Sequence, residues 1–284
     1  MEKSEIMQRV EAFPGVPETV SRLLTLLDDP ETPVDEIEAV LRYDPGLTAN
    51  ILKMANGAYF GFANRISSVR QAVVLLGAKR LTQLVMTSCV NALMEGAVPG
   101  YDLPPGELWR HSIAVSVAAE GLAERLGVQQ REEVFTAALL HDIGKLVLGS
   151  FIADDLDRID AASAPGLSFE VAEREVLGTD HAEIGATILE SWSFPEEMVA
   201  AVRHHHDPDQ ALKAAALIDI VHVANVLCLM IGIGVGREGL QYAPSPTAAK
   251  RLGLKATVLE EVASHTLLLL DQLSEQFNLN EALP

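Results

Sequence analysis

The chain has 284 residues, of which 49% are hydrophobic and 21% are charged, so it can bury a substantial core and is not disordered as a whole. Its formal net charge of −19 repels phosphate backbones, which argues against non-specific nucleic-acid binding. Its two cysteines are far apart in the sequence, so neither a disulfide framework nor a cysteine-rich zinc site is expected.

The sequence gives no indication of secretion or of membrane insertion. The first 15 residues lack the apolar core of a secretion signal. The stretch 214–236 is apolar enough to resemble a membrane span, but Asp219, His222 and Asn225 lie in its middle and are costly in lipid. A buried central helix explains this stretch better. We therefore expect a cytoplasmic protein that makes no contact with a membrane.

Helix start and stop signals alternate in the first 95 residues. Thr32-Pro33 and Asp44-Pro45 each place a capping side chain before a proline at the first helical position. Asn56-Gly57 predicts the end of a helix and Gly77 predicts a break. Apolar residues recur at helical spacing between these signals, so residues 1–95 are predicted to form an N-terminal helical lobe.

Residues 95–106 are rich in glycine and proline and predict a linker. Strand-like alternation is essentially missing beyond it, and residues 96–284 are predicted to form a larger helical lobe, continuous with the first. The predicted fold class is therefore all-α. The helices expected in the larger lobe cover residues 107–126, 131–142, 168–177, 180–192, 195–204, 212–233 and 257–277.

Six of the eight histidines fall where they can converge, namely His111, His141, His181, His204, His205 and His206. Imidazole and carboxylate together suit Zn, Fe, Mn or Ni, and helical bundles supply such ligands from facing helices. Asp142 could bridge two ions, with His181 and the pair His205-His206 as further ligands. Lys145, one turn after His141, could contact a phosphate oxygen.

Each of these signals also has a structural explanation. A lone histidine in an apolar helix is more often a hydrogen-bonded core residue than a ligand, by ~5 to 1. Three histidines at a helix C-terminus can simply favour the negative end of the helix dipole. The order and spacing of the whole set, rather than any single histidine, favour a metal site.

The segments Trp109–Ser112 and Leu139–Lys145 resemble the HD superfamily of metal-dependent phosphohydrolases, whose pattern is a histidine, a His-Asp pair and a late aspartate. His181 and the pair His205-His206 resemble the additional histidines of the HD-GYP branch. This resemblance implies metal ligation by His111, His141, Asp142, His181, His205 and His206, with a catalytic role for Asp142 and Lys145.

Two further positions follow from the same resemblance. Glu107 lies where some members have an extra carboxylate ligand. Asn225 stands where the late aspartate is expected, and its carbonyl oxygen can bind a metal without contributing negative charge. The Gly-Tyr-Pro signature expected after His205-His206 is missing, which argues against hydrolysis of cyclic dinucleotides.

The N-terminal half resembles the HDOD (HD-related output domain) family in Phe13–Pro17, Tyr43–Thr48, Asn56–Gly61 and Ile66–Gly77. The similarity runs from Phe13 to about His206. It implies a multi-helix, HD-like bundle with an N-terminal helical lobe, and a bacterial signalling output module.

Three functions remain in view. The first is a regulatory module that acts through contacts with a signalling protein and keeps a largely intact HD-type metal site for one or two ions. The alternative is a metal-dependent phosphohydrolase or phosphodiesterase acting on a nucleotide or another phosphate ester. The third is a metal-free scaffold, which would leave six inward histidines in need of other partners. Nucleic-acid binding ranks last because of the negative charge.

Overall fold

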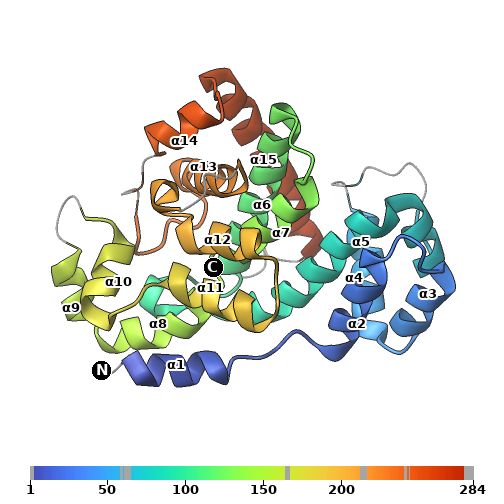
Figure 1. The fold of residues 1–284 in the computed structure, drawn as a ribbon, viewed down its shortest axis with the longest axis horizontal. Coiled ribbons are helices and arrows are strands. Elements are labelled where there is room, and N and C mark those ends of the chain that lie inside the picture. The colour runs from blue at the N-terminus through green and yellow to red at the C-terminus, as the bar shows by residue number, and fades with distance from the viewer. Residues whose placement is uncertain are drawn as a thin grey trace. The chain divides into compact units, whose positions relative to one another are not determined.

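The computed structural model describes residues 3–57, 60, 65–163, 167–211, 216–239, 242 and 244–277. The chain is 73% helical, and no strand occurs among these residues, which confirms the predicted all-α class (Figure 1). One isolated antiparallel bridge joins Val98 and Leu103.

The helices belong to two compact units. The larger unit comprises residues 1–15 and 94–267, and the smaller unit comprises residues 16–93 and 268–284. The N-terminal helix is therefore part of the unit that holds most of the second half of the sequence. The division into domains 1–95 and 96–284 remains a prediction.

Local signals in the sequence account for most of the smaller unit. Its helices are α2 (Glu18–Asp28), α3 (Val34–Arg42), α4 (Pro45–Ala55) and most of α5 (Val69–Met94). Asp44 caps α4 as predicted, because its Oδ1 accepts a hydrogen bond from the Leu47 amide at 2.9 Å and Pro45 follows as the first helical residue. The cap predicted at Thr32 is wrong, since α3 begins after Pro33 and has no side-chain cap.

Two of the predicted interruptions also occur in the smaller unit. Asn56 ends α4 and then bonds both backbone groups of Ile66, at 2.8 Å to its oxygen and 2.7 Å to its amide. Residues 58, 59 and 61 of the predicted motif 56–61 lie outside the described residues. Gly77 interrupts α5 with a φ of 73°, a backbone conformation that glycine adopts readily.

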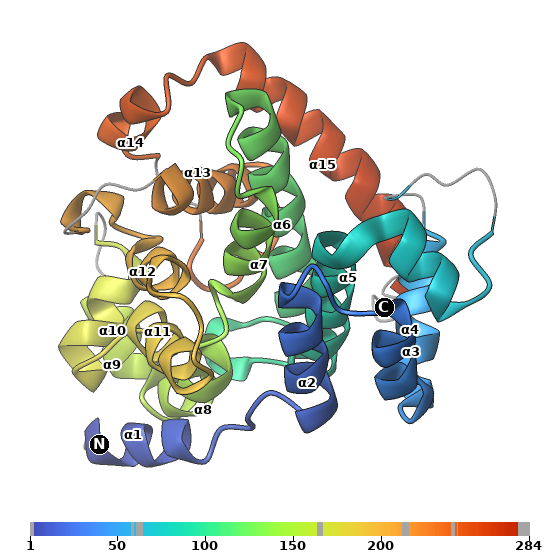
Figure 2. The same ribbon diagram turned by 45° about the vertical axis from the view of Figure 1, so that its right-hand side comes forward.

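The larger unit is built around α6 (Glu107–Leu126), which packs against α7 (Arg131–Leu140) and α13 (Ala216–Met230) (Figure 2). Short side chains at Ala114, Ala118 and Ala119 are fully buried and let neighbouring helices approach closely. The other elements are α1 (Lys3–Glu11), η1 (Pro99–Tyr101), α8 (Lys145–Asp154), α9 (Leu156–Ala162), α10 (Phe169–Leu177), α11 (His181–Ser191), α12 (Glu196–His204), η2 (Pro208–Gln210), α14 (Pro246–Arg251) and α15 (Ala256–Phe277), which continues into the smaller unit.

The predicted linker 95–106 is instead part of the core of the larger unit. Its η1 turn packs against α8, and Tyr101 is only 1% exposed. A side chain at Gly100 would collide with the Gly149 carbonyl oxygen, so glycine is needed for this close approach. The segment therefore forms a tight turn whose apolar residues Val98, Tyr101 and Leu103 are buried.

Two helical stretches, 69–94 and 131–154, are long and apolar enough to meet a length-and-composition test for a membrane span. In the most apolar part of each, 56% and 89% of the residues are buried inside the protein. The predicted candidate near 214–236 forms the shorter helix α13, whose predicted start at residue 212 lies outside the described residues. Core helices of this kind pass the same test, so these stretches are weak indications of a membrane span.

Candidate metal centre

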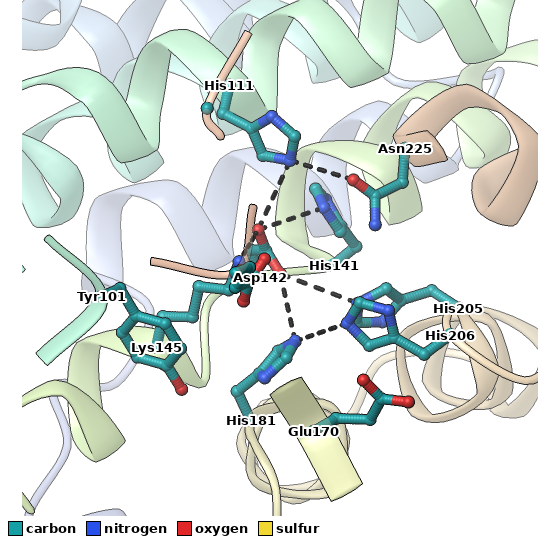
Figure 3. Close-up of polar contacts among 12 residues, drawn as sticks. Tyr101, His111, His141, Asp142, Lys145, Glu170, His181, His205, His206 and Asn225 are labelled. Atoms are coloured by element: carbon teal, nitrogen blue, oxygen red, sulfur yellow. Dashed lines mark hydrogen bonds and ion pairs between the residues drawn. The ribbon is translucent and has the colours of Figure 1, made fainter. Parts of the chain in front are cut away.

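The helices of the larger unit and the turns that follow them bring most of the predicted ligands together. Figure 3 shows their side chains directed toward Asp142, which follows α7 in the turn that leads to α8. The contributing residues are His111 in α6, His141 at the end of α7, His181 at the start of α11, His205 and His206 after α12, and Asn225 in α13.

The close approach of α8 and α11 depends on Gly144. A Cβ atom there would collide with the His181 carbonyl oxygen and would lie 2.7 Å from the Gly185 amide. Asp180 caps α11, since its Oδ1 accepts from the Glu183 amide at 2.7 Å, which fixes His181 as the first helical residue. The chain therefore places His181 beside Asp142 through backbone contacts.

Asp142 lies at the centre of the cluster and presents a different oxygen to each side. Its Oδ2 is 3.3 Å from His141 Nε2 and 3.5 Å from His111 Nε2. Its Oδ1 is 3.5 Å from His181 Nε2 and 3.7 Å from His205 Nε2. The carboxylate is fully buried, and the surrounding positive groups lower its pKa although burial opposes this. It is placed as a bridge between two sets of nitrogen ligands.

His141 and His205 are oriented in the same way. Each ends its helix and donates from Nδ1 to the carbonyl oxygen three residues earlier, Ala138 and Val202 respectively, at 2.7 Å. These bonds place the ring proton on Nδ1, so the lone pair of Nε2 faces the cluster.

The hydrogen bonds of the cluster fit a bound cation. Among the described residues, the buried Nε2 atoms of His141 and His205 and both carboxylate oxygens of Asp142 make no hydrogen bond. His141 and His205 belong to two different groups of close ligand atoms, which share Asp142. Buried polar atoms normally have partners, and each group offers nitrogen and oxygen ligands suited to a divalent transition-metal ion.

His181 is held by a buried carboxylate. Glu173 accepts from the His181 backbone amide and from its ring Nδ1, both at 2.8 Å, and from the Tyr101 hydroxyl at 2.6 Å. Burial lowers the pKa of His181, but Glu173 more than offsets this and raises it to about 9. His181 Nε2 lies 2.8 Å from His206 Nε2, a hydrogen-bond distance at which the two rings can share one proton.

His206 lies at the less buried side of the cluster. Its ring stacks on Tyr242 with centroids 4.6 Å apart, and the Tyr242 hydroxyl donates to Glu170 at 2.9 Å. The ring of His206 is therefore held between Tyr242 and the other histidines.

His111 and Asn225 face each other across the opposite side. His111 Nδ1 donates to the Ile233 carbonyl oxygen at 3.1 Å, and its Nε2 lies 3.1 Å from Asn225 Oδ1. Burial lowers the pKa of His111 to about 3, so its ring is neutral. Two acceptors in contact are compatible with a shared cation, or with the Asn225 amide turned to donate.

Lys145 is enclosed between two carboxylates. Its Nζ lies 2.7 Å from Asp142 Oδ2 and 2.7 Å from Glu238 Oε1, and all three side chains are buried. Burial lowers the pKa of Lys145, but Asp142 and Glu238 together raise it above its usual value. Two carboxylates therefore already face the single positive charge of the ammonium, which leaves no free charge for a phosphate.

Two of the predicted residues, Glu107 and His204, lie outside the cluster, as does His222, which was not predicted to belong to it. Glu107 bonds the Gly234 amide at 3.3 Å and Arg110 at 3.1 Å, and it belongs to none of the close ligand groups among the described residues. His204 does not join the other five histidines in those groups. His222 is a hydrogen-bonded core residue, donating to the His205 carbonyl oxygen at 2.7 Å and accepting from the Ser245 amide at 2.8 Å.

Sequence reasoning missed the buried partners of the cluster, Glu173, Glu238 and Tyr101. Glu173 is eight residues before His181 but on another helix, Tyr101 is in the supposed linker, and Glu238 is in the connection after α13. No local signal distinguishes Glu173, since Glu170, Arg174 and Glu175 lie beside it in the same helix.

An all-helical unit in which a His-Asp pair at a helix end meets further histidines places the protein in the HD superfamily. The HDOD domain family profile matches residues 13–208, and the chain belongs to that family. This match confirms the resemblance found in the sequence.

The relatives found by sequence share 25% and 33% of the aligned residues with this chain. The chain is 25% identical over 226 residues to an uncharacterized protein of Treponema pallidum, a match that covers 78% of this chain and 43% of that protein. It is 33% identical over 146 residues to ribonuclease Y of Thermus thermophilus, covering 51% of this chain and 20% of that protein. The chain spans less than half the length of these curated relatives.

Solved structures match nearly the whole chain. An HDOD domain protein of unknown function from Geobacter sulfurreducens has a TM-score of 0.79 and 27% identity, with 96% of each chain covered. A protein described as a candidate phosphohydrolase from Shewanella amazonensis has a TM-score of 0.65 and 26% identity, covering 92% of this chain and 97% of the other.

Proposed function

We propose that the protein is a bacterial signal-transduction module that acts through protein contacts and carries a resident divalent metal ion in the His/Asp cluster. The observation that carries the metal is the close group of Asp142, His181, His205 and His206, in which the buried His205 Nε2 and Asp142 Oδ1 make no hydrogen bond among the described residues. Membership of the HDOD family supports the regulatory role. The ion is a transition metal of the Zn, Fe, Mn or Ni kind, because its ligands are mainly imidazoles.

The geometry favours a regulatory role over hydrolysis. Lys145, the residue expected to contact a phosphate, is neutralised by Asp142 and Glu238 at 2.7 Å each. Asn225 supplies no charge where a catalytic site of this class would use an aspartate. A bound divalent ion would supply an activated water and charge for a phosphate, but these residues do not prepare the site to receive one.

The second candidate, a metal-dependent phosphohydrolase, is favoured by the near-complete ligand set of His111, His141, Asp142, His181 and His205-His206. The structural similarity to the candidate phosphohydrolase of Shewanella amazonensis supports it as well. Under this hypothesis Asp142 would be a metal ligand. Lys145 would have to break its ion pair with Glu238 in order to contact substrate.

We also propose that the partner is a signalling protein inside the cell and that neither nucleic acid nor membrane is bound. Ribonuclease Y acts on RNA, as its name states, but the match covers only 20% of that protein. A net charge of −19 opposes contact with an RNA backbone.

Elemental analysis of the purified protein tests the proposal, with Asp142→Ala to remove the shared ligand and His265→Ala as a control at an exposed histidine. We expect metal in the parent and in His265→Ala but not in Asp142→Ala, with helicity checked by circular dichroism. No metal in the parent would refute the proposed site.

Two hydrolysis assays separate the candidates: phosphate release from nucleotides, and conversion of a cyclic dinucleotide to its linear product. We expect the metal-loaded parent to form no more of either product than Asp142→Ala. Hydrolysis that disappears in Asp142→Ala would establish the phosphohydrolase instead.

A further inference from the structure

The metal cluster has two halves that share Asp142 but differ in charge. The three-histidine half consists of His181, His205 and His206 with Asp142 Oδ1, and the two-histidine half consists of His111, His141 and Asn225 with Asp142 Oδ2.

A cation already lies against the two-histidine half. The Lys145 ammonium is 2.7 Å from Asp142 Oδ2, the same oxygen that lies 3.3 Å from His141 Nε2 and 3.5 Å from His111 Nε2. Glu238 holds the ammonium in place from its other side at 2.7 Å. A divalent ion bound to Oδ2 would therefore be repelled by a positive charge that the protein keeps there.

The two-histidine half also lacks its own negative charge. Its remaining ligand candidate is Asn225, whose carbonyl oxygen lies 3.1 Å from His111 Nε2. Without a second carboxylate, Asp142 is the only anionic ligand of this half, and Lys145 neutralises it.

In the three-histidine half, Asp142 presents the oxygen that is not paired with Lys145. Neither carboxylate oxygen makes a hydrogen bond among the described residues, but the Lys145 ion pair is to Oδ2, whereas Oδ1 lies 3.5 Å from His181 Nε2 and 3.7 Å from His205 Nε2. Glu173 supports His181 from behind at 2.8 Å, an arrangement that orients a ligating histidine and increases its basicity. Three imidazoles and one carboxylate oxygen complete the four ligands that Zn²⁺ prefers.

We propose that the protein holds a single divalent ion in the three-histidine half, and that the Lys145 ammonium takes the place of a second ion. The inference rests on the proposed metal site and adds its stoichiometry and position. Lys145 is then a built-in cation that balances Asp142, and Glu238, from the connection after α13, is the residue that keeps it there.

Zn²⁺ titration of the chelator-treated full chain tests the proposal, with metal content and thermal stability as readouts. We expect one Zn²⁺ per chain in the parent. His206→Ala should weaken binding at least about 10-fold and abolish the Zn²⁺-dependent rise in melting temperature. His111→Ala, the matched change in the other half, should keep one Zn²⁺ with an affinity within about threefold of the parent.

A gain of function tests the role of Lys145. Asn225→Asp alone should still bind one Zn²⁺, because the ammonium remains. The double variant Lys145→Met/Asn225→Asp should bind two. If the unpaired Glu238 prevents folding, the triple variant that adds Glu238→Gln removes that buried charge and should also bind two.

The outcomes separate this inference from the proposed function. Two Zn²⁺ in the parent, or equal losses in His111→Ala and His206→Ala, would overturn the single-ion arrangement and leave the metal site standing. A gain variant that folds but still binds one ion would overturn the role of Lys145. No Zn²⁺ in the parent would overturn both proposals.

Discussion

Glu120 predicts an unusual dependence of stability on pH. It lies in α6 and is only 8% exposed. Burial, followed by repulsion from Glu132 and Glu124, raises its pKa from 4.5 to about 8. The folded protein therefore keeps this carboxyl protonated in a range where the unfolded chain has released the proton. The protonated carboxyl contributes stability that is fully present below about pH 4.5 and is lost as the pH rises through about 8.

The expected size follows from the shift in pKa. One pH unit in this window changes the free energy of unfolding by up to about 1.4 kcal/mol, so Glu120 should remove about 2–3 kcal/mol between about pH 5 and pH 7. Glu120→Gln is uncharged in both states and should lack this dependence. Any pH-independent effect of the glutamine side chain on the free energy of unfolding cancels when only the change with pH is compared.

Urea unfolding followed by circular dichroism, repeated between about pH 5 and pH 8, measures the difference between parent and variant. We expect the stability of Glu120→Gln relative to the parent to increase with pH. Glu175→Gln, an exposed position on α10, should follow the parent throughout. Parallel curves for the parent and Glu120→Gln would refute the reasoning, because they would mean that this carboxyl titrates normally in the folded state.

Two other predictions concern the supports of the metal centre. Gly144→Ala should lower the free energy of unfolding by about 2–3 kcal/mol, because its Cβ has no room against the backbone at the start of α11, whereas Gly96→Ala, where nothing lies within 4 Å, should have little effect. Urea unfolding of both variants measures this, and equal stabilities would contradict the packing. Tyr101→Phe should cost about 1–3 kcal/mol because Glu173 loses a buried hydrogen bond, whereas Tyr43→Phe, 86% exposed, should be neutral. A Tyr101→Phe protein as stable as the parent would show that Glu173 does not depend on this donor.

Helices with clear local boundaries could be predicted from the sequence. α6 begins and ends at the predicted residues, Glu107 and Leu126, because Gly106 and Gly127 flank it and both have positive φ. α8 was missed, since its sequence KLVLGSFIAD is apolar on nearly every face and gives no helical period. The linker prediction failed for a related reason: glycine and proline mark tight turns whether these are exposed or buried.

Only those residues of the candidate site that form recognisable short motifs could be predicted from the sequence. His141-Asp142 and His205-His206 stand out as short motifs, and the structure brings them together. Their partners cannot be found by spacing, because Glu173 and Glu238 reach the cluster from separate elements. Glu107 shows the converse, since it lies one turn before His111 and yet bonds the Gly234 amide.

The matching hydrogen bonds of His141 and His205 also stabilise the ends of the helices that carry them. Each imidazole donates a hydrogen bond to a carbonyl oxygen that would otherwise be unpaired at the end of its helix. This bond does not depend on a metal. Replacing either histidine would cost about 1 kcal/mol of helix-end stability even in a chain that bound no ion. The two histidines therefore stabilise the ends of their helices whether or not an ion is bound, so a chain with this fold could keep both residues after losing the metal.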